Sequence, residues 1–368
     1  MSKKVDYVIV GAGLFGATFA RLMREAGRTV HLLDQRPHIA GNCYTQSMEG
    51  IQVHTYGPHI FHTSNKTVWE FVNRFATFNH FVNRPKVHYK DKLYSFPINL
   101  MTLYQLWGVT TPAQAEVKLA SVRIPNDHPK NLEEWILSQV GPEIYETFIK
   151  GYTIKQWQRD PKDLPALIIR RLPIRLTFDD NYFNDPYQGI PIGGYTQMIA
   201  NMLGDAPVSL DTDYFTDRAY WTEMASKKVV YTGKIDAYFD YRLGELEYRT
   251  LRFENKVMDI PDYQGNAVIN YTDAAVPYTR VAEHKHFEMS TGPKTVVTWE
   301  YPDDWQRDKV PYYPINDEKN TVLYNRYREL ALAEKNVIFG GRLAQYKYYD
   351  MHQVIEVAMA AAKKELQA

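Results

Sequence analysis

The sequence has a single cysteine, Cys43, among 368 residues. One cysteine cannot form an internal disulfide, so we do not expect a disulfide-stabilised scaffold, and we expect the chain in a reducing cytoplasm. Net charge is also absent, because 43 basic side chains balance 43 acidic ones. This balance gives no general attraction to nucleic acid or to a membrane surface. No apolar run reaches about 18 residues, so we expect no membrane-spanning helix.

The sequence is, in contrast, long and rich in tyrosine. A chain of 368 residues can form roughly two or three subdomains with substantial cores. The 28 tyrosines and seven tryptophans combine an apolar ring with a polar group, which suits sites that bind sugars and bases. We expect most of them to be ordinary half-buried residues. The composition therefore favours a sugar or nucleotide ligand without identifying one.

The N-terminal stretch predicts a strand, a helix and a second strand. Val5–Val10 is apolar and rich in strand-forming residues, as a buried parallel strand must be. From Leu14 to Ala26 the apolar residues recur at helical spacing, and Gly27 stands where a glycine commonly ends a helix. Thr29–Leu33 then reads as the second strand of a βαβ unit.

Three glycines form the pattern G-x-G-x-x-G between the first strand and the helix. Gly11 allows a tight turn, Gly13 lets the backbone approach a pyrophosphate, and Gly16 lets the helix pack closely on the strand. The helix N-terminus, which includes Phe15, adds N–H groups and a positive dipole end for the phosphates. Asp34 ends the second strand, where a carboxylate accepts hydrogen bonds from an adenosine ribose. The unit therefore predicts a Rossmann-like dinucleotide-binding domain, since a tight turn without a ligand would leave Asp34 unexplained.

The residues after Asp34 favour a flavin over a nicotinamide nucleotide. Gln35 is followed by Arg-x-His-x-Ala-Gly-Asn, which ends at Gly41 and Asn42. The two small residues leave space for a flavin, and the pattern resembles that of FAD proteins of the glutathione-reductase-like and amine-oxidase-like types. Ala40 replaces the usual first glycine, and we expect the backbone to tolerate it because alanine is small.

Three histidines, His54, His59 and His62, lie close together in the sequence. No carboxylate or cysteine joins them at the spacing of metal ligands, so we expect no metal site. Gly57-Pro58 predicts a turn that presses backbone against a flat ring, which would place His59 and Ile60 near the flavin. We interpret His62 as a hydrogen-bonded core or capping residue.

The remaining pattern predicts three subdomains. The FAD-binding domain comprises residues 1–76, 190–235 and 326–368, and a helical subdomain with a mobile lid covers residues 97–181. An antiparallel sheet subdomain comprises residues 77–96, 182–189 and 236–325. Helical periodicity indicates helices at Leu100–Trp107, Pro112–Ser121, Leu132–Val140 and Glu143–Lys150. Strand patterns occur at Val208–Leu210, Val229–Tyr231, Val268–Tyr271, Thr295–Glu300 and 337–339.

A stretch rich in cations and aromatic residues runs from Gly151 to Phe183. It contains Gly-Tyr-Thr-Ile-Lys-Gln-Trp at 151–157, Arg-Arg-Leu-Pro at 170–173 and Asp-Asn-Tyr-Phe at 180–183. Arginine forks bind phosphates and aromatic faces stack on rings, so the stretch suits a ligand with phosphates, a sugar and a base. A solvated basic helix face is the alternative interpretation of the Arg170-Arg171 pair.

Together with three later motifs, this stretch resembles the bacterial type of UDP-galactopyranose mutase. The later motifs are Val-Pro-Tyr-Thr-Arg at 276–280, Pro-Tyr-Tyr-Pro at 311–314 and Tyr-x-Tyr-x-Asp-Met at 346–351. Each is weak alone, but their order behind an FAD pattern is specific, and the resemblance covers nearly the whole chain. It implies a mixed α/β FAD domain with an inserted helical-bundle subdomain and an antiparallel sheet.

The resemblance implies an isomerase that interconverts UDP-galactopyranose and UDP-galactofuranose and supplies galactofuranose for cell-surface polysaccharide. The ring contraction involves no net redox change. In this family FAD must be reduced, and its N5 attacks the anomeric carbon and displaces UDP. The resemblance further implies an NAD(P)H-linked or other reductant, which the sequence does not identify, and a homodimer.

Residue roles follow from the motif matches. Arg171 and Arg280 would stabilise charge on the leaving pyrophosphate, Arg171 from a proline-bounded segment that suits a lid, and we group His59 with them. The implied substrate-binding residues are Tyr152, Trp157, Asn181, Tyr182, Phe183, Tyr313, Tyr348 and Asp350. The implied cofactor-binding residues are Gly11, Gly13, Phe15, Gly16, Asp34, Gln35, Gly41, Asn42, His59, Ile60, Arg342, Asp350 and Met351.

Two other functions share part of this pattern. A flavin amine oxidase or desaturase would keep the FAD elements, but it would need an apolar substrate tunnel instead of arginines and tyrosines around an anion. A catalytically inactive FAD-binding protein would need no motif outside the nucleotide fold. The sequence does not exclude related substrates such as UDP-arabinopyranose, because a site discriminates against one missing hydroxymethyl group by only about 1–3 kcal/mol.

Overall fold

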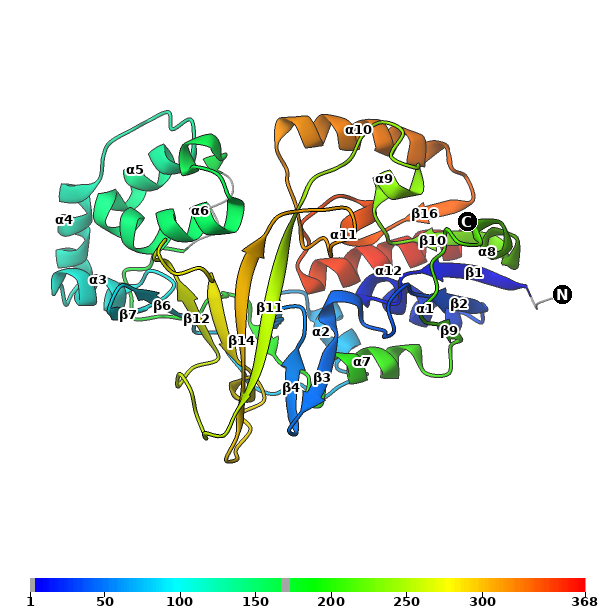
Figure 1. Ribbon diagram of the computed structural model, residues 1–368, viewed down its shortest axis with the longest axis horizontal. Helices are drawn as coiled ribbons and strands as arrows, with labels where there is room; N and C mark the ends of the chain where they lie inside the picture. Colours follow the sequence, from blue (N-terminus) through cyan, green and yellow to red (C-terminus); the bar gives the residue numbers. More distant parts are fainter. Residues whose placement is uncertain (1–3, 167–172, 368) are drawn as a thin grey trace.

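The structure is a computed structural model that describes residues 4–166 and 173–367 (Figure 1). A parallel sheet with its helices lies on one side, a larger sheet lies in the middle, and a group of helices lies on the other side. Among the described residues, none of the helices combines the length and apolar character that crossing a membrane requires.

The parallel sheet has five strands in the order β16-β10-β1-β2-β9. They are β1 (Val5–Val10), β2 (Val30–Leu33), β9 (Val208–Ser209), β10 (Ala225–Tyr231) and β16 (Val337–Phe339). The strands predicted at Val208–Leu210, Val229–Tyr231 and 337–339 are therefore confirmed, and they pair with the strands of the N-terminal βαβ unit in one sheet. The carboxyl ends of the strands meet at one edge, which is where ligands bind in sheets of this kind.

Helices cover both faces of this sheet. On one face lie α1 (Leu14–Glu25), α2 (Lys66–Val72), α7 (Gly194–Leu203) and α12 (Met351–Gln367). On the other lie α8 (Arg218–Met224), α9 (Ile235–Tyr238), α10 (Glu318–Ala333) and α11 (Gly341–Ala344). Successive residues of a strand point to opposite faces, so Ile9 belongs to the first core and Val8 to the second. This double coverage explains why β1 is apolar throughout.

The larger sheet has seven strands in the order β15-β11-β14-β13-β12-β6-β7. They are β6 (Lys86–Tyr89), β7 (Lys92–Ser95), β11 (Tyr248–Met258), β12 (Val268–Tyr271), β13 (Arg280–Glu283), β14 (Thr295–Asp303) and β15 (Tyr313–Pro314). All neighbours pair antiparallel except β12 and β6, which are parallel. The sheet is therefore mixed, with its one parallel pairing between β12 and β6.

The helical group contains α3 (Leu100–Trp107), α4 (Pro112–Val122), α5 (Leu132–Ile144), the π-helical turn η2 (Tyr145–Lys150) and α6 (Gly151–Trp157). The first three predicted helices are confirmed, the second with a longer C-terminal end. Gly141 has a φ of +79° and is followed by Pro142, so α5 is interrupted directly after Val140. The chain is helical again from Pro142 through η2 into α6, which confirms the fourth predicted helix and extends it beyond Lys150.

Two small antiparallel sheets complete the described elements. β3 (Thr45–Met48) pairs with β4 (Ile51–His54), and β5 (Phe61–Thr63) pairs with β8 (Tyr187–Gly189). Short 3₁₀ turns are η1 (Gly41–Cys43), η3 (Pro161–Asp163) and η5 (His284–His286). β8 thus pairs with a strand from the N-terminal region and not with the seven-stranded sheet. The three subdomain boundaries stay predictions.

Candidate functional site

Gly11 and Gly16 explain the turn between β1 and α1. Gly11 has a φ of +108°, and a Cβ there would lie 2.0 Å from Thr232 Oγ1. A Cβ on Gly16 would lie 2.0 Å from the Gly11 carbonyl oxygen. Only glycine avoids these overlaps, so the tight turn and the close approach of helix to strand have the geometric origin that the sequence predicts.

Gly13 and Gly41 face each other across the entrance to this turn. A Cβ on Gly41 would lie 3.2 Å from Gly13 Cα, and Gly41 has a φ of +54°. Ala40 beside it also has a left-handed φ, of +76°, and its N–H donates to the Ala12 carbonyl at 2.9 Å. The backbone thus accepts alanine in a left-handed conformation, which is the reason that glycine is usual at this position. The two glycines leave bare backbone where a pyrophosphate would approach.

Asp34 and Arg36 supply the charges beside this turn. Asp34 accepts from the Ala12 N–H at 2.9 Å and from the Arg36 N–H at 3.0 Å, one on each carboxylate oxygen. The Arg36 guanidinium donates from Nη2 to Asn42 Oδ1 at 2.8 Å and lies over the Tyr56 ring. Its Nη1 is buried without a hydrogen-bond partner among the described residues. A half-buried cation with an unused donor fits an anionic dinucleotide at this edge.

Sequence reasoning missed Arg36 as a site residue. The available signal was its place in the Arg-x-His pattern, directly after Asp34. Gln35, which was predicted to bind the cofactor, is exposed. Phe15 is buried at the start of α1, and a Cβ on Gly340 would lie 2.0 Å from its ring. Phe15 thus shapes the cradle through packing against the end of β16.

His59 lies close to both Arg342 and Arg280. Its Nδ1 is 2.7 Å from the Gly57 carbonyl oxygen, which can only accept, so Nδ1 carries the proton and Nε2 is an acceptor. Burial, with a smaller contribution from the nearby positive charges of Arg342 and Arg280, lowers the pKa of His59 to about 4. The ring is therefore neutral at neutral pH. Ile60 follows it and packs on the core around Ile190.

Arg280 is held across three strands of the seven-stranded sheet. Its Nε donates to Asn270 Oδ1 at 3.2 Å, and its Nη1 is 3.4 Å from Glu300 Oε2. Its Nη2 is 3.3 Å from the Tyr152 hydroxyl on α6. The arginine side chain keeps 25% of its exposure but the glutamate only 4%, so a ligand can reach the cation and not its counter-ion.

The electrostatics keep Arg280 charged and its tyrosine neighbours protonated. Burial alone would lower the pKa of Arg280, but Glu300 and Tyr152 outweigh it and raise the pKa. Burial raises the pKa of Tyr152 to about 12, and burial also raises that of Tyr313. Both hydroxyls therefore stay available as hydrogen-bond donors at neutral pH.

Tyrosines connect Arg280 with Arg342. The rings of Tyr313 and Tyr348 are 5.3 Å apart, and the Arg342 guanidinium lies 5.0 Å from the Tyr348 ring. Arg342 also donates from Nη2 to the Tyr312 carbonyl at 2.8 Å. The structure thus brings together five residues predicted from separate motifs, namely Tyr152, Arg280, Tyr313, Arg342 and Tyr348. Sequence reasoning missed Asn270 and Glu300, which complete this group.

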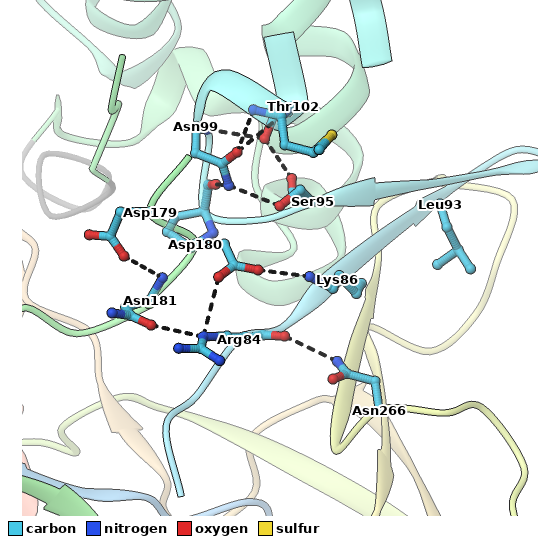
Figure 2. Close-up of polar contacts among 12 residues, drawn as sticks. Arg84, Lys86, Leu93, Ser95, Asn99, Thr102, Asp179, Asp180, Asn181 and Asn266 are labelled. Carbon is cyan, nitrogen blue, oxygen red and sulfur yellow. Dashed lines mark hydrogen bonds and ion pairs between the residues drawn. The ribbon is translucent and has the colours of Figure 1, made fainter. Parts of the chain in front are cut away.

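Several other predicted residues lie around this group. Asn181 accepts from Arg84 Nε at 2.9 Å, and its neighbour Asp180 binds Lys86 at 3.0 Å (Figure 2). Figure 2 shows these contacts as one polar network that attaches the 179–181 segment to the chain before and within β6. Tyr182 is 37% exposed, which leaves its ring accessible to a ligand. Trp157 packs against the core of the helical group. Arg171 lies outside the described residues.

His62, Phe183 and Asp350 form a neighbouring cluster. The His62 ring stacks on Phe183 at 3.6 Å, and its Nδ1 binds Asp185 at 2.6 Å. Asp350 and His352, around the start of α12, each offer an atom within 4.8 Å of one on His62. The expectation of no metal stays a prediction, but its argument from spacing does not hold for His62. Met351 begins α12 and packs against the core of the parallel sheet.

Comparison with models of known families shows which family the sequence matches. Residues 147–348 match the family model for UDP-galactopyranose mutase, and residues 9–75 match one for an NAD(P)-binding Rossmann-like domain. The chain belongs to the UDP-galactopyranose mutase family.

Full-length relatives agree with this assignment to the UDP-galactopyranose mutase family. A dTDP-fucopyranose mutase of Escherichia coli is 41% identical over 366 residues, with 97% of each chain covered. A probable UDP-galactopyranose mutase of Klebsiella pneumoniae is 41% identical over 368 residues, with 98% of this chain and 94% of the relative covered. A crystal structure of reduced UDP-galactopyranose mutase has a TM-score of 0.71 at 13% identity, over 99% of this chain and 96% of that chain, which supports the fold.

The predicted family and the predicted α/β fold are therefore confirmed, and the chain is an enzyme of the UDP-galactopyranose mutase family. The Rossmann-like segment, together with membership of this family, implies a flavin cofactor. The glycine turn and the unused Arg36 donor agree with that cofactor on physical grounds.

Proposed function

We propose that the chain interconverts UDP-galactopyranose and UDP-galactofuranose, with FAD bound in its reduced form at the carboxyl edge of the parallel sheet. The observation that carries this proposal is Arg280, a charged and accessible arginine fixed by Asn270, Glu300 and Tyr152. Such a cation suits the pyrophosphate of a nucleotide sugar and has no use in an apolar amine-oxidase tunnel.

Charge stabilisation is the main task of the protein in this proposal. When the bond between sugar and UDP breaks, negative charge grows on the pyrophosphate, and a fixed cation facing it is worth several kcal/mol. Arg280 supplies that charge, and Tyr313 and Tyr348 donate hydrogen bonds to the same phosphates. Arg171 is the second cation by its motif match. Tyr152 also orients Arg280 through its hydroxyl oxygen.

The FAD would lie along the glycine turn. Gly11, Gly13 and Gly16 admit the pyrophosphate, and Arg36 adds a positive charge beside it. Asp34 still has acceptor capacity for a ribose hydroxyl, because each of its oxygens receives a single backbone N–H. Further contacts are assigned to Phe15, Gln35, Gly41, Asn42, Ile60, Arg342, Asp350 and Met351. When bound and reduced, FAD supplies the nucleophilic N5 for the anomeric carbon.

The sugar would lie between the flavin and Arg280, close to His59. The neutral His59 ring presents Nε2 as an acceptor for a sugar hydroxyl proton, while its Nδ1–H stays on Gly57. Tyr182, Phe183, Asn181 and Trp157 are assigned to the uridine and sugar side. We further propose a cytoplasmic enzyme that acts as a homodimer, uses an NAD(P)H-linked or other reductant, and supplies galactofuranose for cell-surface polysaccharide.

A second substrate has equal support from sequence identity. The dTDP-fucopyranose mutase of E. coli is 41% identical to this chain, as is the probable UDP-galactopyranose mutase of K. pneumoniae. The two nucleotide sugars share the pyrophosphate that Arg280 would bind. They differ in the base and in the sugar, so the assay must include both.

The experiment is a chromatographic assay of the purified protein with UDP-galactofuranose and with dTDP-fucofuranose, each with and without dithionite. We expect conversion of UDP-galactofuranose to the pyranose, and only under reduction. Faster conversion of dTDP-fucofuranose would reassign the substrate. Oxygen consumption with net substrate oxidation would favour the amine-oxidase-like alternative, and no conversion of either sugar would overturn the proposed function.

A further inference from the structure

Lys155 of α6 binds four backbone carbonyls at the turn between β12 and β13. Its Nζ is 2.8 Å from the oxygens of Tyr271 and Asp273, 3.0 Å from that of Val276 and 2.9 Å from that of Tyr278. An ammonium group has three hydrogens, so four oxygens at these distances surround it as a coordination shell. Backbone carbonyls arranged in this way also replace the hydration shell of simple cations.

This turn leads directly into Arg280. Tyr278 lies two residues before the arginine, and Thr279 between them is fixed on both sides. The Thr279 N–H donates to the Glu300 carbonyl, and the Thr279 carbonyl accepts from the Tyr271 N–H, both at 2.9 Å. The position of the Arg280 backbone therefore depends on the turn that Lys155 holds.

The helix that carries Lys155 also contacts Arg280 through a side chain. Tyr152 lies three residues earlier on α6, and its hydroxyl is 3.3 Å from Arg280 Nη2. Gly151 packs so closely on the turn that a Cβ would lie 2.1 Å from the Thr272 carbonyl oxygen. Figure 1 shows α6 beside this end of the seven-stranded sheet. One short helix thus fixes both the backbone and the guanidinium of the arginine.

We propose that Lys155 is a positioning residue that sets Arg280 for binding the pyrophosphate of a nucleoside diphosphate. This inference rests on the proposed function of Arg280. A second lysine that binds several backbone carbonyls, in the turn η5 directly after β13, offers a matched comparison. Lys285 donates to the carbonyls of Pro261, Gly292 and Lys294, beyond the other end of β13. Among the described residues, none of the three carbonyls belongs to a residue that orients Arg280.

The test measures UDP binding by calorimetry to the purified flavoprotein. Lys155→Met removes the charge at similar length, and we expect the Kd for UDP to rise at least tenfold with flavin content unchanged. Lys285→Met should lower Tm and leave the Kd for UDP as in the wild type. Losses of affinity that simply follow the losses of Tm in both variants would reduce Lys155 to a structural residue and overturn the proposal.

Cation rescue adds a readout that a purely structural role would not move. In Lys155→Ala the carbonyl shell keeps its oxygens, so methylammonium should restore part of the UDP affinity, and it should have no effect on the wild type or on Lys285→Ala. If Lys155→Ala binds UDP as tightly as the wild type and methylammonium has no effect on it, the proposal is overturned. Should Lys155→Met not fold, Lys155→Arg replaces it. A planar guanidinium cannot fill a shell built around one nitrogen, so its Kd should also rise, and an unchanged Kd would count against Lys155.

UDP binding separates this inference from the proposed function. A wild type that binds UDP but converts no nucleotide sugar would end the proposed reaction and leave the Lys155 comparison intact. A wild type that binds neither UDP nor dTDP would overturn both.

Discussion

Arg280 of β13 lies directly opposite Glu300 of β14, and the arginine Nη1 is 3.4 Å from the glutamate Oε2. On its other side the arginine lies opposite Asn270 of β12, which accepts from Nε. The guanidinium is therefore fixed from both neighbouring strands, with Tyr152 at the remaining Nη2. A cation fixed in this way loses little entropy on meeting a phosphate, which is the condition for strong transition-state stabilisation.

The arrangement predicts that Glu300 acts through orientation more than through charge. Glu300→Gln keeps an acceptor for Nη1, so kcat/KM should fall by less than about tenfold. Glu300→Ala frees the arginine and leaves a partly buried cation uncompensated, so kcat/KM should approach the loss of at least about 100-fold that we expect for Arg280→Ala. All three variants should retain the yellow flavin. Equal losses in Glu300→Gln and Glu300→Ala would show that charge is what matters.

Gly13 offers a test of the flavin cradle that is independent of activity. Its φ is −81°, and an added Cβ meets only Gly41, at 3.7 Å. The protein itself can therefore accept Gly13→Ala with a change in stability of about 0.5 kcal/mol or less, whereas the methyl group would meet a bound pyrophosphate. We expect the variant to purify with little flavin and with near wild-type stability in the flavin-free form.

Gly27 is the matched control for Gly13. It has a φ of +74° and nothing within 4 Å of an added Cβ. Gly27→Ala should therefore cost roughly 1–2 kcal/mol of stability through backbone strain alone and keep its flavin. Gly27→Ala thus tests the effect of backbone strain alone, and Gly13→Ala tests whether a ligand needs the space beside the glycine. Full flavin occupancy in Gly13→Ala, measured by the absorbance ratio of flavin to protein, would place the pyrophosphate elsewhere.

Buried neutral histidines predict that the protein loses stability in mild acid. Burial lowers the pKa of His284 to about 3, and its Nδ1 accepts the His54 N–H at 3.2 Å. Burial likewise lowers the pKa of His59 to about 4. Between these values and the unfolded value of about 6.5 the unfolded chain binds more protons, so stability falls as the pH falls.

Each of these histidines contributes a slope of up to about 1.4 kcal/mol per pH unit over its window. Urea unfolding at pH 7, 6 and 5 measures the total slope. His284→Gln should be less stable at pH 7 but should show a smaller slope, because one titrating group is gone. Glu283 raises the pKa of His286, so this histidine opposes the slope near pH 6.5 and above and adds little well below pH 6.5, where both states are protonated. If the slope of stability against pH is the same in His284→Gln as in the wild type, His284 is not one of the groups that cause the acid destabilisation.

Local patterns in the sequence predicted the nucleotide fold well. β1 and α1 follow from strand apolarity and helical spacing, which depend on neighbouring residues only. The helix α10 was not predicted, because its apolar residues are not confined to one face: Leu323, Tyr327 and Leu330 pack on the core, whereas Val322 and Leu332 are exposed. The break between the third and fourth predicted helices was placed correctly after Val140, and the structure adds its cause, the positive φ of Gly141.

The candidate site was predictable only where a motif carried it. Arg280 and Tyr152 stood in recognisable motifs, but Glu300 and Asn270 become their partners through strand register, which no local pattern fixes. Lys155 also stood in a quoted motif. Its acceptors are backbone carbonyls, which have no sequence signature, so its place beneath the Arg280 turn could come only from the structure.

That carbonyl shell predicts a pH dependence of UDP binding. Burial lowers the pKa of Lys155 to about 8, and the nearby Asp273 carboxylate opposes the shift. The lysine is therefore largely charged at pH 7 and loses its proton as the pH rises through about 8. Tyr271 and Tyr278 also face the turn, but burial raises the pKa of Tyr271 to about 12 and raises that of Tyr278, so neither interferes near pH 8.

If the ammonium sets Arg280, the Kd for UDP should rise between pH 7 and pH 9.5 in the wild type. UDP itself is fully ionised across this range, because its last phosphate pKa is near 6 by analogy with other phosphate monoesters. In Lys155→Met the Kd should be high and should not change with pH over the same range, since the titrating group is missing. Calorimetric titrations of both proteins at matched ionic strength measure the two profiles. A parallel rise in both would assign the pH dependence to another group and leave Lys155 without a role in setting the arginine.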